Sequence, residues 1–488
     1  MRANNLTLLT DLYELTMMQG YFKNPTNQTV IFDMFYRVNP CGGSFAIAAG
    51  LEQMIEYIEN LHFSDEDIDY LRSLHIFEED FLTYLSDFHF TGDIYAIPEG
   101  TVVFPREPLV KVIAPIMEAQ LVETAILNII NHQSLIATKA ARVCYAARGD
   151  GIMEFGLRRA QGPDAGIYGA RAAVIGGCAG TSNVLTGQMF NVPVLGTHAH
   201  SWIMSFPDEY TAFKTYARMY PDSCTLLVDT YDVLKSGVPN AIRVFEEMRE
   251  EGVKLTHYGI RIDSGDLAYL SKEAYKMLAA AGFDDATISA SSDLDEYLID
   301  SLKSQDAKIT SWGVGTNLIT SKDNPAFGGV YKLAAVKDAG SNSFTPKIKL
   351  SENTEKVTNP GNKTVYRIYS KSTGKIKADM ICLTDEIIDP EETMVIFDPV
   401  DTWKKTKVLG GTYELRELLV PVIREGKRIY TSPEVMDIRE YCRKEQNTLW
   451  DESRRLVNPQ KVYVDLSQKL FDLKKNLLEE MSEKNLDE

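Results

Sequence analysis

One stretch of the chain, residues 258–292, reads YGIRIDSGDLAYLSKEAYKMLAAAGFDDATISASS. Its two ends, 258–263 and 287–292, are short runs that favour β-strands. Residues 266–282 between them have the apolar spacing of a helix, and Asp266 can cap its first turn. A strand, a polar turn, a helix and a second strand in this order form the βα unit of a parallel sheet.

The same unit recurs on both sides of this stretch. We expect further strands at 151–156, 193–197, 224–229 and 311–316, and further helices at 208–220, 239–252 and 293–305. Polar or charged residues follow nearly every strand: Arg158 and Arg159, Thr197 to His200, Asp229 and Thr230, Asp263 to Asp266, Ser291 to Asp293, and Gly315 to Asn317. An open sheet concentrates its ligand at one switch point, whereas a barrel gathers the ends of all its strands. The even distribution favours an α/β fold built on an irregular βα barrel.

The segments on either side of the barrel have a different pattern. Before it, strand-like runs at 29–37, 44–50 and 94–98 alternate with helical runs at 51–60 and 66–86, and a long helical stretch covers about 115–147. After Gly328, strand-like runs at 330–336, 346–351, 365–370 and 378–383 follow one another around the turn-rich NPGNK at 359–363. We therefore expect an additional α/β domain in residues 1–130, the catalytic barrel in 131–345, and a C-terminal segment, 346–488, that packs on the N-terminal domain.

Composition narrows the class of partner. The 488 residues carry a formal charge of −18, which repels nucleic acid and anionic membrane surfaces. Six cysteines without a CxxC pair indicate free thiols in a reducing compartment, and the N-terminus lacks the layout of a secretory signal, so we expect a cytoplasmic protein. Ala172 to Pro207 contains no Asp, Glu, Lys or Arg, but its glycines and prolines fit buried backbone near a ligand better than a bilayer span.

Four motifs at the strand ends could carry chemistry. GVGT at 313–316 could direct backbone N–H groups at a phosphate, or be an ordinary turn. In IRIDSGD at 260–266, Arg261 and Asp263 share one strand face, where they could bind a substrate carboxylate and a ribose or magnesium ion, or form a structural salt bridge.

The other two motifs also allow two interpretations each. The arginines of EFGLRRAQGPDAG at 154–166 could hold anions or simply face solvent. GTHAHSW at 196–202 lacks a nearby third ligand for a metal; its histidines could satisfy core hydrogen bonds, or one could accept a phosphoryl group.

Together these motifs resemble the nicotinate phosphoribosyltransferase family, as do DLYELTMMQGYF at 11–22, FDMFYRVNPCGGSFAIAAGL at 32–51 and WGVGTNL at 312–318. The likeness runs from Asp11 to about Val336. It implies a type II phosphoribosyltransferase-like barrel with an additional α/β domain, working as a homodimer whose active site is shared between subunits. It also implies the joining of nicotinate to 5-phosphoribosyl 1-diphosphate, with release of diphosphate, coupled ATP hydrolysis and Mg²⁺, in NAD biosynthesis.

The resemblance assigns roles to individual residues. His200 would be the phosphorylated histidine, whereas His198 stands at a variable position and receives no role. Arg261 would fix the nicotinate carboxylate, and Asp263 would serve ribose or, as a metal ligand, magnesium. The remaining binding residues would be Phe155 and Tyr13, which would stack on the pyridine ring with Tyr13 coming from the partner subunit, Arg158 and Thr197, and Gly313, Gly315 and Thr316, which would hold the 5-phosphate.

Two other functions remain open at this point. A nicotinamide phosphoribosyltransferase would share the barrel and the histidine, but an amide-specific pocket can use a carboxylate, and GGCAGTSN at 176–183 has none. A non-catalytic phosphosugar-binding barrel would keep the phosphate site and need neither His200 nor the acids of DSGD.

Overall fold

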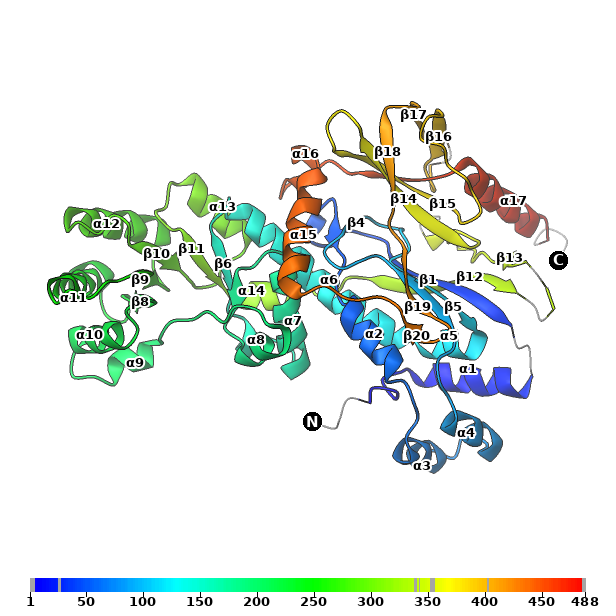
Figure 1. Ribbon diagram of the computed structural model, residues 1–488, viewed down its shortest axis with the longest axis horizontal. Coiled ribbons are helices and arrows are strands. Elements are labelled where there is room, and N and C mark those ends of the chain that lie inside the picture. The colour runs from blue at the N-terminus through cyan, green and yellow to red at the C-terminus, as the bar shows by residue number, and fades with distance from the viewer. Residues whose placement is uncertain are drawn as a thin grey trace. The chain divides into compact units, whose positions relative to one another are not determined.

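The computed structural model describes residues 5–24, 28–337, 340–341, 343–351, 356–401 and 403–484 (Figure 1). The chain divides into two compact units. The first unit comprises Met1–Leu135, Ala326–Pro433 and Tyr441–Glu488, and the second comprises Ile136–Pro325 and Glu434–Glu440. The domain boundaries expected at residues 130 and 345 stay a prediction.

A parallel sheet forms the centre of the second unit. Its strands are β6 (Gly151–Glu154), β7 (Gly180–Thr181), β8 (Cys224–Leu227), β9 (Tyr258–Ile262), β10 (Thr287–Ala290) and β11 (Ser311–Val314). They lie in the order β7-β6-β11-β10-β9-β8. The first and last long strands of the series, β6 and β11, are therefore neighbours, as they are in a sheet that curls round. This confirms the irregular βα barrel.

The curled sheet differs in one respect from the expected strands. Residues 193–197 form no full strand, but Val194 makes a parallel bridge to Thr181 of β7. The two-residue β7 itself has no strand signal, because a Gly-Thr pair is too short for alternation to be visible. The barrel is accordingly incomplete between this bridge and β8.

Helices connect the strands of the second unit, and four of them correspond to the helices expected at 208–220, 239–252, 266–282 and 293–305. They are α7 (Pro163–Ile175), α8 (Val184–Phe190), α9 (His200–Met204), α10 (Glu209–Met219), α11 (Val238–Glu250), α12 (Leu267–Ala280), α13 (Glu296–Ser304) and α14 (Thr316–Ile319), with a 3-10 turn at Leu157–Arg159. Side chains of Asp208, Asp266 and Asp295 accept hydrogen bonds from the first turns of α10, α12 and α13. The acids before these helices therefore act as N-caps.

Antiparallel sheets dominate the first unit. One has the order β13-β12-β1-β5-β3-β19-β20 and another the order β17-β16-β21-β15-β14-β18, while β2 pairs with β4. Their strands are β1 (Thr29–Tyr36), β2 (Ala46–Ile47), β3 (Asp93–Ala96), β4 (Val102–Val103), β5 (Val110–Pro115), β12 (Gly329–Lys337), β13 (Thr345–Pro346), β14 (Lys363–Ser370), β15 (Ile376–Leu383), β16 (Met394–Phe397), β17 (Lys405–Val408), β18 (Tyr413–Glu417), β19 (Val420–Arg424), β20 (Lys427–Arg428) and β21 (Tyr463–Leu466). The first of these sheets thus joins strands from both ends of the chain, whereas the second is built only from strands between residues 363 and 466.

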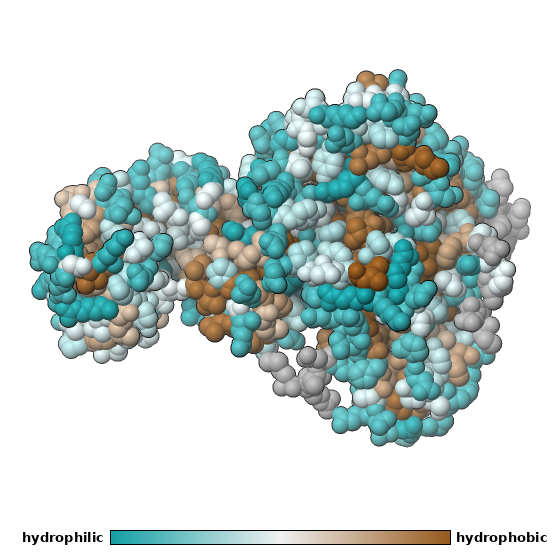
Figure 2. Space-filling model, in the orientation of Figure 1, coloured by the Kyte–Doolittle hydropathy of each residue, from teal (hydrophilic) through white to brown (hydrophobic). Residues whose placement is uncertain are grey.

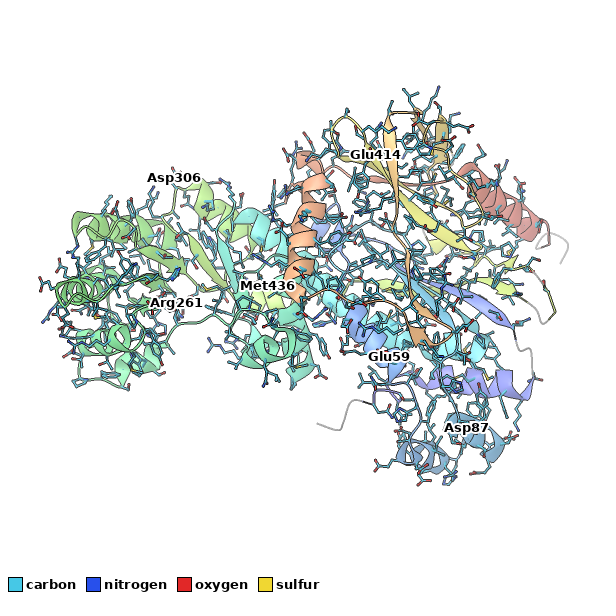
Figure 3. All side chains as sticks on the ribbon, in the orientation of Figure 1. Glu59, Asp87, Arg261, Asp306, Glu414 and Met436 are labelled. Atoms are coloured by element: carbon cyan, nitrogen blue, oxygen red, sulfur yellow. The ribbon has the colours of Figure 1, made fainter. Side chains whose placement is uncertain are left out.

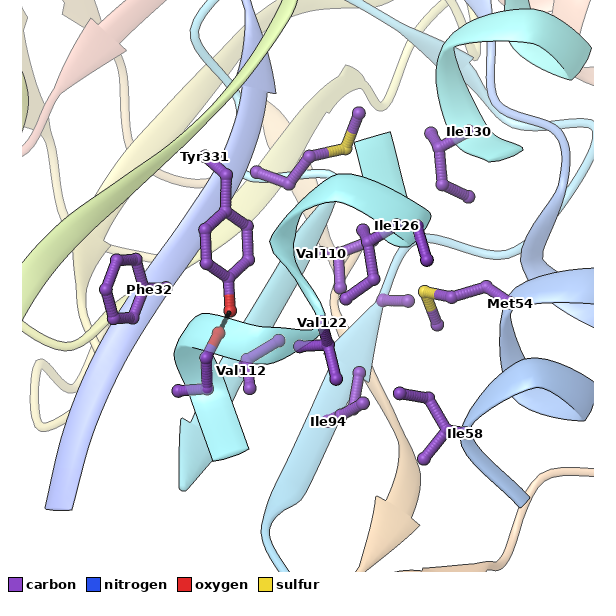
Figure 4. Close-up of a cluster of buried hydrophobic side chains, with 14 of the residues drawn as sticks. Phe32, Met54, Ile58, Ile94, Val110, Val112, Val122, Ile126, Ile130 and Tyr331 are labelled. Atoms are coloured by element: carbon purple, nitrogen blue, oxygen red, sulfur yellow. Dashed lines mark hydrogen bonds between the residues drawn. The ribbon is translucent and has the colours of Figure 1, made fainter. Parts of the chain in front are cut away.

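Helices cover these sheets. They are α1 (Leu12–Lys23), α2 (Leu51–Glu59), α3 (Asp65–Ser73), α4 (Glu79–Ser86), α5 (Ile116–Leu121), α16 (Asp451–Arg454) and α17 (Gln468–Lys484), while α6 (Glu123–Ala146) and α15 (Val435–Thr448) run through both units. The main core lies between the first sheet and helices α1, α2, α5 and α6 (Figure 4). There the Phe32 and Tyr331 rings stack at 4.7 Å, and the Tyr331 hydroxyl donates to the Ala119 carbonyl oxygen at 2.7 Å.

The surface is mostly hydrophilic, with separate hydrophobic areas (Figure 2). One such area lies over α8, where Val184, Leu185 and Met189 are exposed. None of the helices in the described ranges combines the length and apolar character needed to cross a membrane. The uncharged stretch from Ala172 to Pro207 is divided among α7, β7, α8 and α9, so it is no single hydrophobic span.

Candidate active site

His200, Asp229 and Asp263 form one hydrogen-bonded group, in which Asp229 follows β8 and Asp263 follows β9. Nε2 of His200, the first residue of α9, lies 3.2 Å from Oδ1 of Asp229, which follows β8. Oδ2 of Asp229 accepts hydrogen bonds from the Asp263 backbone N–H at 3.0 Å and the Ser264 hydroxyl at 2.6 Å. The Asp229 side chain is 2% exposed and that of His200 is 40% exposed. A buried carboxylate thus orients an imidazole that solvent can reach.

Arg261 lies beside this group on β9 (labelled in Figure 3). Its Nη1 donates to the Thr197 hydroxyl, and its Nε is buried without a hydrogen-bond partner among the described residues. Burial lowers the pKa of Arg261, the charges of Asp263 and Asp229 oppose this, and Arg158 adds to the lowering. Arg158 and Arg261 are therefore close enough to feel each other's charge. Two cations with a donor to spare suit an anionic ligand.

Asp263 retains one free carboxylate oxygen. Its Oδ1 accepts a hydrogen bond from the Ser291 hydroxyl, which follows β10. Its Oδ2 accepts none from the part of the chain that the structure describes. No group of three or more His, Cys, Asp and Glu side chains within that part could hold a metal ion. One available carboxylate suits a magnesium ion that arrives with a substrate's phosphates, because Mg²⁺ commonly takes one or two protein carboxylates.

His198, by contrast, is a structural residue. Its Nε2 accepts a hydrogen bond from the Leu227 N–H at 3.3 Å, and its ring meets the Tyr216 ring edge-on at 4.6 Å. Burial lowers the pKa of His198 to about 4, and the charges of Arg261 and His200 act in the same direction. A neutral imidazole that binds a β8 amide fits the interpretation of a core histidine.

Phe155 and Gly313 lie in contact on the neighbouring strands β6 and β11. The Phe155 N–H donates to the Val314 carbonyl oxygen at 2.8 Å. A Cβ at Gly313 would stand 2.6 Å from Cδ2 of the Phe155 ring, and one at Gly315 would stand 3.3 Å from the Phe155 carbonyl oxygen. The glycines of GVGT therefore make room for Phe155, and Thr316 begins α14 directly after them.

Sequence reasoning assigned no role to several residues that build this site. Glu154 is buried, which raises its pKa, and it accepts hydrogen bonds from the Thr181 hydroxyl at 2.6 Å and from the Gly156 N–H. It thereby holds the loop that leads to the exposed Arg158. The side chain of Asn317 donates to the Asp293 and Leu294 carbonyl oxygens and ties α14 to the loop after β10. For Asp229, its place directly after a buried strand was the available signal.

Tyr13 is the expected site residue that the structure does not bring to this group. It belongs to α1 in the first unit and is 47% exposed. Burial and the neighbouring Glu14 raise the pKa of its phenol. Its expected stacking opposite Phe155, across a subunit boundary, stays a prediction.

Comparisons with known proteins agree along the whole chain. Three family models match the chain. The model of the nicotinate phosphoribosyltransferase (NAPRTase) N-terminal domain matches residues 8–131, and the model of the NAPRTase family matches residues 151–371. The model of the nicotinate phosphoribosyltransferase C-terminal domain matches residues 362–474. The Bacillus subtilis (strain 168) nicotinate phosphoribosyltransferase is 46% identical over 99% of each chain. The human protein of the same name is 32% identical over 98% of this chain and 97% of its own.

Solved structures show the same fold. The crystal structure of human nicotinic acid phosphoribosyltransferase has a TM-score of 0.82 at 30% identity, covering 96% of this chain and all (100%) of that one. The nicotinate-nucleotide pyrophosphorylase of Pyrococcus furiosus has a TM-score of 0.69 at 21% identity, covering 92% and 97%, which shows the fold alone. The curled sheet and the charged groups at its strand ends define an enzyme of the phosphoribosyltransferase class. Identity over nearly the full length then places the chain in the nicotinate phosphoribosyltransferase family.

Proposed function

We propose that this enzyme forms nicotinate mononucleotide and diphosphate from nicotinate and 5-phosphoribosyl 1-diphosphate in NAD biosynthesis, with ATP hydrolysis coupled to the step. The observation that carries the proposal is the group made by His200, Asp229, Asp263 and Arg261, because it combines a phosphoryl acceptor, two acids and an anion-binding cation. The family relationship supports the two substrates. A cytoplasmic location stays a prediction, and the six free cysteines support it.

Binding would use the cations and the aromatic ring. Arg261 has an unpaired buried Nε and would bind the nicotinate carboxylate, while the exposed Arg158 would meet phosphate oxygens. Phe155, fixed against Gly313, would hold one face of the pyridine ring. Thr197 keeps Arg261 in place, and Gly315 and Thr316 would offer backbone amides to the 5-phosphate. Such orientation lowers the barrier by fixing the ring nitrogen in line with C1 of the ribose.

The transfer itself separates charge. As the bond from C1 to diphosphate breaks, the ribose becomes cationic and the leaving oxygens gain negative charge. Arg158 would stabilise those oxygens, and Asp263 would face the ribose hydroxyls. A magnesium ion held by the free oxygen of Asp263 would neutralise diphosphate charge when bound. The lone pair of the ring nitrogen then forms the bond to C1.

His200 would couple ATP to this step. With its Nε2–H donating to Asp229, the lone pair of Nδ1 can attack the γ-phosphorus of ATP, so that an N–P bond forms and ADP leaves. Asp229 would stabilise the imidazolium character that develops. Hydrolysis of the N–P bond would later remove negative charge from the mouth of the site and thereby favour release of the product.

Labelled ATP tests the coupling. Label from the γ-phosphate should appear on the wild-type protein, be absent from His200→Ala, and be strongly reduced in Asp229→Asn, which keeps the shape and loses the charge. The protein with His198→Gln serves as the matched control and should still take up label. No transfer to the wild type would favour a binding protein over the proposed ATP-coupled enzyme.

A second measurement tests the substrate. Turnover with nicotinate should greatly exceed turnover with nicotinamide, because the site offers an arginine to a carboxylate, and the carboxylate near Thr181, Glu154, already accepts two hydrogen bonds. Equal or reversed rates would contradict the assignment to the acid.

The family resemblance also leads us to propose a homodimer. On α1, Leu12, Tyr13 and Met17 are 54%, 47% and 37% exposed, which is unusual for three large apolar residues within two turns. A partner subunit on this face would bury them and would carry Tyr13 toward its own substrate ring. This exposure supports the shared active site that the family resemblance implies.

A further inference from the structure

A cavity of about 340 Å³ lies in the first unit, between α17 and the residues that follow β16. Phe471, Lys474, Lys475 and Leu478 recur at helical spacing and therefore place one face of α17 against it. Val400 contributes to the opposite wall. The volume falls in the range of sites that hold small molecules. None of the residues proposed for catalysis lines this cavity.

One of the residues that line the cavity, Lys474, carries a buried ammonium group. Lys474 is 7% exposed, and its Nζ donates to the side-chain oxygen of Asn359 at 2.9 Å and to the Pro399 carbonyl oxygen at 3.0 Å. Among the described residues, Lys474 has no carboxylate within salt-bridge distance. A lysine this deeply buried is rarely left without an anionic partner.

The charges around Lys474 also indicate that its ammonium group lacks an anionic partner. Burial lowers the pKa of Lys474 to about 8, Arg106 and Lys363 lower it further, and Asp398 opposes them. The chain carries an excess of acids, yet this ammonium faces more positive than negative neighbours. An anion that entered the cavity would relieve that repulsion.

The other lining residues indicate the chemical character of the rest of the ligand. Val400, Phe471 and Leu478 are apolar, and the Phe471 ring is held in a stack with Phe397 at 4.6 Å. Glu479 lies among the lining residues and disfavours a second negative charge. An apolar body with a single anionic group satisfies both the walls and the ammonium.

We propose that this cavity binds an amphipathic monocarboxylate, with its carboxylate on Lys474 and its apolar body against Phe471 and Leu478. The cavity shares no lining residue with the proposed active site, so this proposal does not depend on the proposed function. A fatty acid and an aromatic acid share this chemistry, so the experiment separates them.

Calorimetric titration of the full chain with octanoate, octanol, octylammonium, 1-naphthoate and nicotinate tests the proposal. Octanoate or 1-naphthoate should bind saturably at about one per chain below ~1 mM, octanol about tenfold more weakly, and octylammonium not measurably. The stronger of the two acids identifies the aliphatic or aromatic class. Octanol binding as tightly as octanoate, or neither acid binding by ~5 mM, would overturn the proposal.

Two matched variants identify the site. Lys474→Met removes the charge at similar length and should weaken the acid about tenfold while leaving octanol unchanged. Lys469→Met, at an exposed position of α17 outside the cavity, should change neither. Leu478→Trp fills the cavity and should abolish binding of both ligands, which keeps the proposal testable if Lys474→Met fails to fold. Equal losses in Lys474→Met and Lys469→Met, or full binding to Leu478→Trp, would place the ligand elsewhere.

The pH dependence is an independent check. Because the ammonium loses its proton as the pH rises through about 8, affinity for octanoate should fall above that pH and octanol affinity should not. The titratable and charged neighbours are Arg106, Lys363 and Asp398, with Lys475 and Glu479 on α17 itself. Affinity for octanoate that stays constant from pH 7 to about 9.5 would count against Lys474 as the partner.

Discussion

His198 and His200 stand two residues apart but differ in what surrounds them. His198 turns into the protein onto a β8 amide and the Tyr216 ring, whereas His200 faces Asp229 and solvent. Alternation of side chains along an extended segment would place both on one face, but α9 begins at His200 and redirects its side chain. The start of that short helix therefore decides which imidazole can react.

The buried His198 predicts a loss of stability in acid. Its folded pKa of about 4 lies below the unfolded value near 6.5, so the unfolded chain binds the extra proton between these values. The contribution is complete above about pH 6.5 and is lost as the pH falls toward 4, by about 2 kcal/mol between pH 7 and pH 5. Melting of the wild type and of His198→Gln at both pH values measures it. A variant that loses as much stability as the wild type would contradict this origin.

Replacement of Arg261 by lysine tests its proposed role in binding the nicotinate carboxylate. Lysine keeps the charge but loses the planar fork and its bond geometry to Thr197. Arg261→Lys should therefore weaken nicotinate binding by on the order of 1–3 kcal/mol. The KM for nicotinate is the quantity to measure, with Arg159→Lys, an exposed neighbour in the same loop motif as Arg158, as the control. An unchanged KM would remove Arg261 from carboxylate binding.

Among the elements, the contact of β6 with β11 sets the position of Phe155. Gly313→Ala would place a methyl group within 2.6 Å of the ring and force Phe155 to move. We expect a large rise in the KM for nicotinate with little change in melting temperature, because the ring borders the site. The control is Gly151→Ala, at the start of β6, where an added Cβ meets nothing within 4 Å. Equal kinetics in the two variants would show that Phe155 does not hold the ring.

Two cations on α6 hold α13 through one buried carboxylate. Lys139 Nζ lies 2.6 Å from Glu296 Oε2, and Arg142 Nε lies 3.0 Å from Oε1. Burial raises the pKa of Glu296, but the two cations outweigh it and the net shift is downward. Glu296→Gln should cost about 3–5 kcal/mol, since both buried cations lose the negative charge that compensates them.

The matched control for Glu296→Gln is Asp300→Asn, which removes a carboxylate from an ion pair near the same helices. Arg148 and Asp300 form a half-exposed pair at 2.9 Å, so Asp300→Asn should cost under about 1 kcal/mol. Chemical denaturation of the two variants compares them directly. Similar losses would mean that the Glu296 contacts add no more than a surface pair does.

The sequence predicted helices and strands best where the residues that determine an element lie within the element itself. Helices α10 to α13 appear within a few residues of their expected ranges, because apolar periodicity and Asp caps both lie within each segment. The expected helix at 66–86 is two helices instead, α3 and α4, since His75 adopts a positive φ of 57° between them. The strand expected at 346–351 does not form, because only Pro346 of that range pairs with β12, as the last residue of β13.

The candidate active site was predictable only in part, because some of its contacts join residues that are distant in the sequence. His200, Arg261 and Asp263 were visible because polar residues directly follow apolar strands. Their partners Asp229 and Ser291 come from other βα units, and single-sequence spacing contains no information on which strand lies beside which. Glu154 looked like an ordinary strand residue, although its buried carboxylate fixes the loop toward Arg158.

At the scale of the whole molecule, the exposed face of α1 makes the proposed dimer testable. Leu12→Glu with Met17→Glu should give a monomer in sedimentation experiments and strongly reduce turnover, because charge on a buried apolar interface is costly. Tyr70→Glu, at an equally exposed aromatic on α3, should change neither. An active monomer would contradict a site completed by the partner, and an intact dimer would move the interface elsewhere.

The pairing of β1 with β12 and of β3 with β19 affects how the chain is made. A ribosome releases β1 hundreds of residues before β19, and the βα barrel emerges in between. The barrel can therefore fold first, while β1 waits with an uncovered edge that invites association with other nascent chains. The part of the protein that is synthesised earliest is in this way the last to be completed.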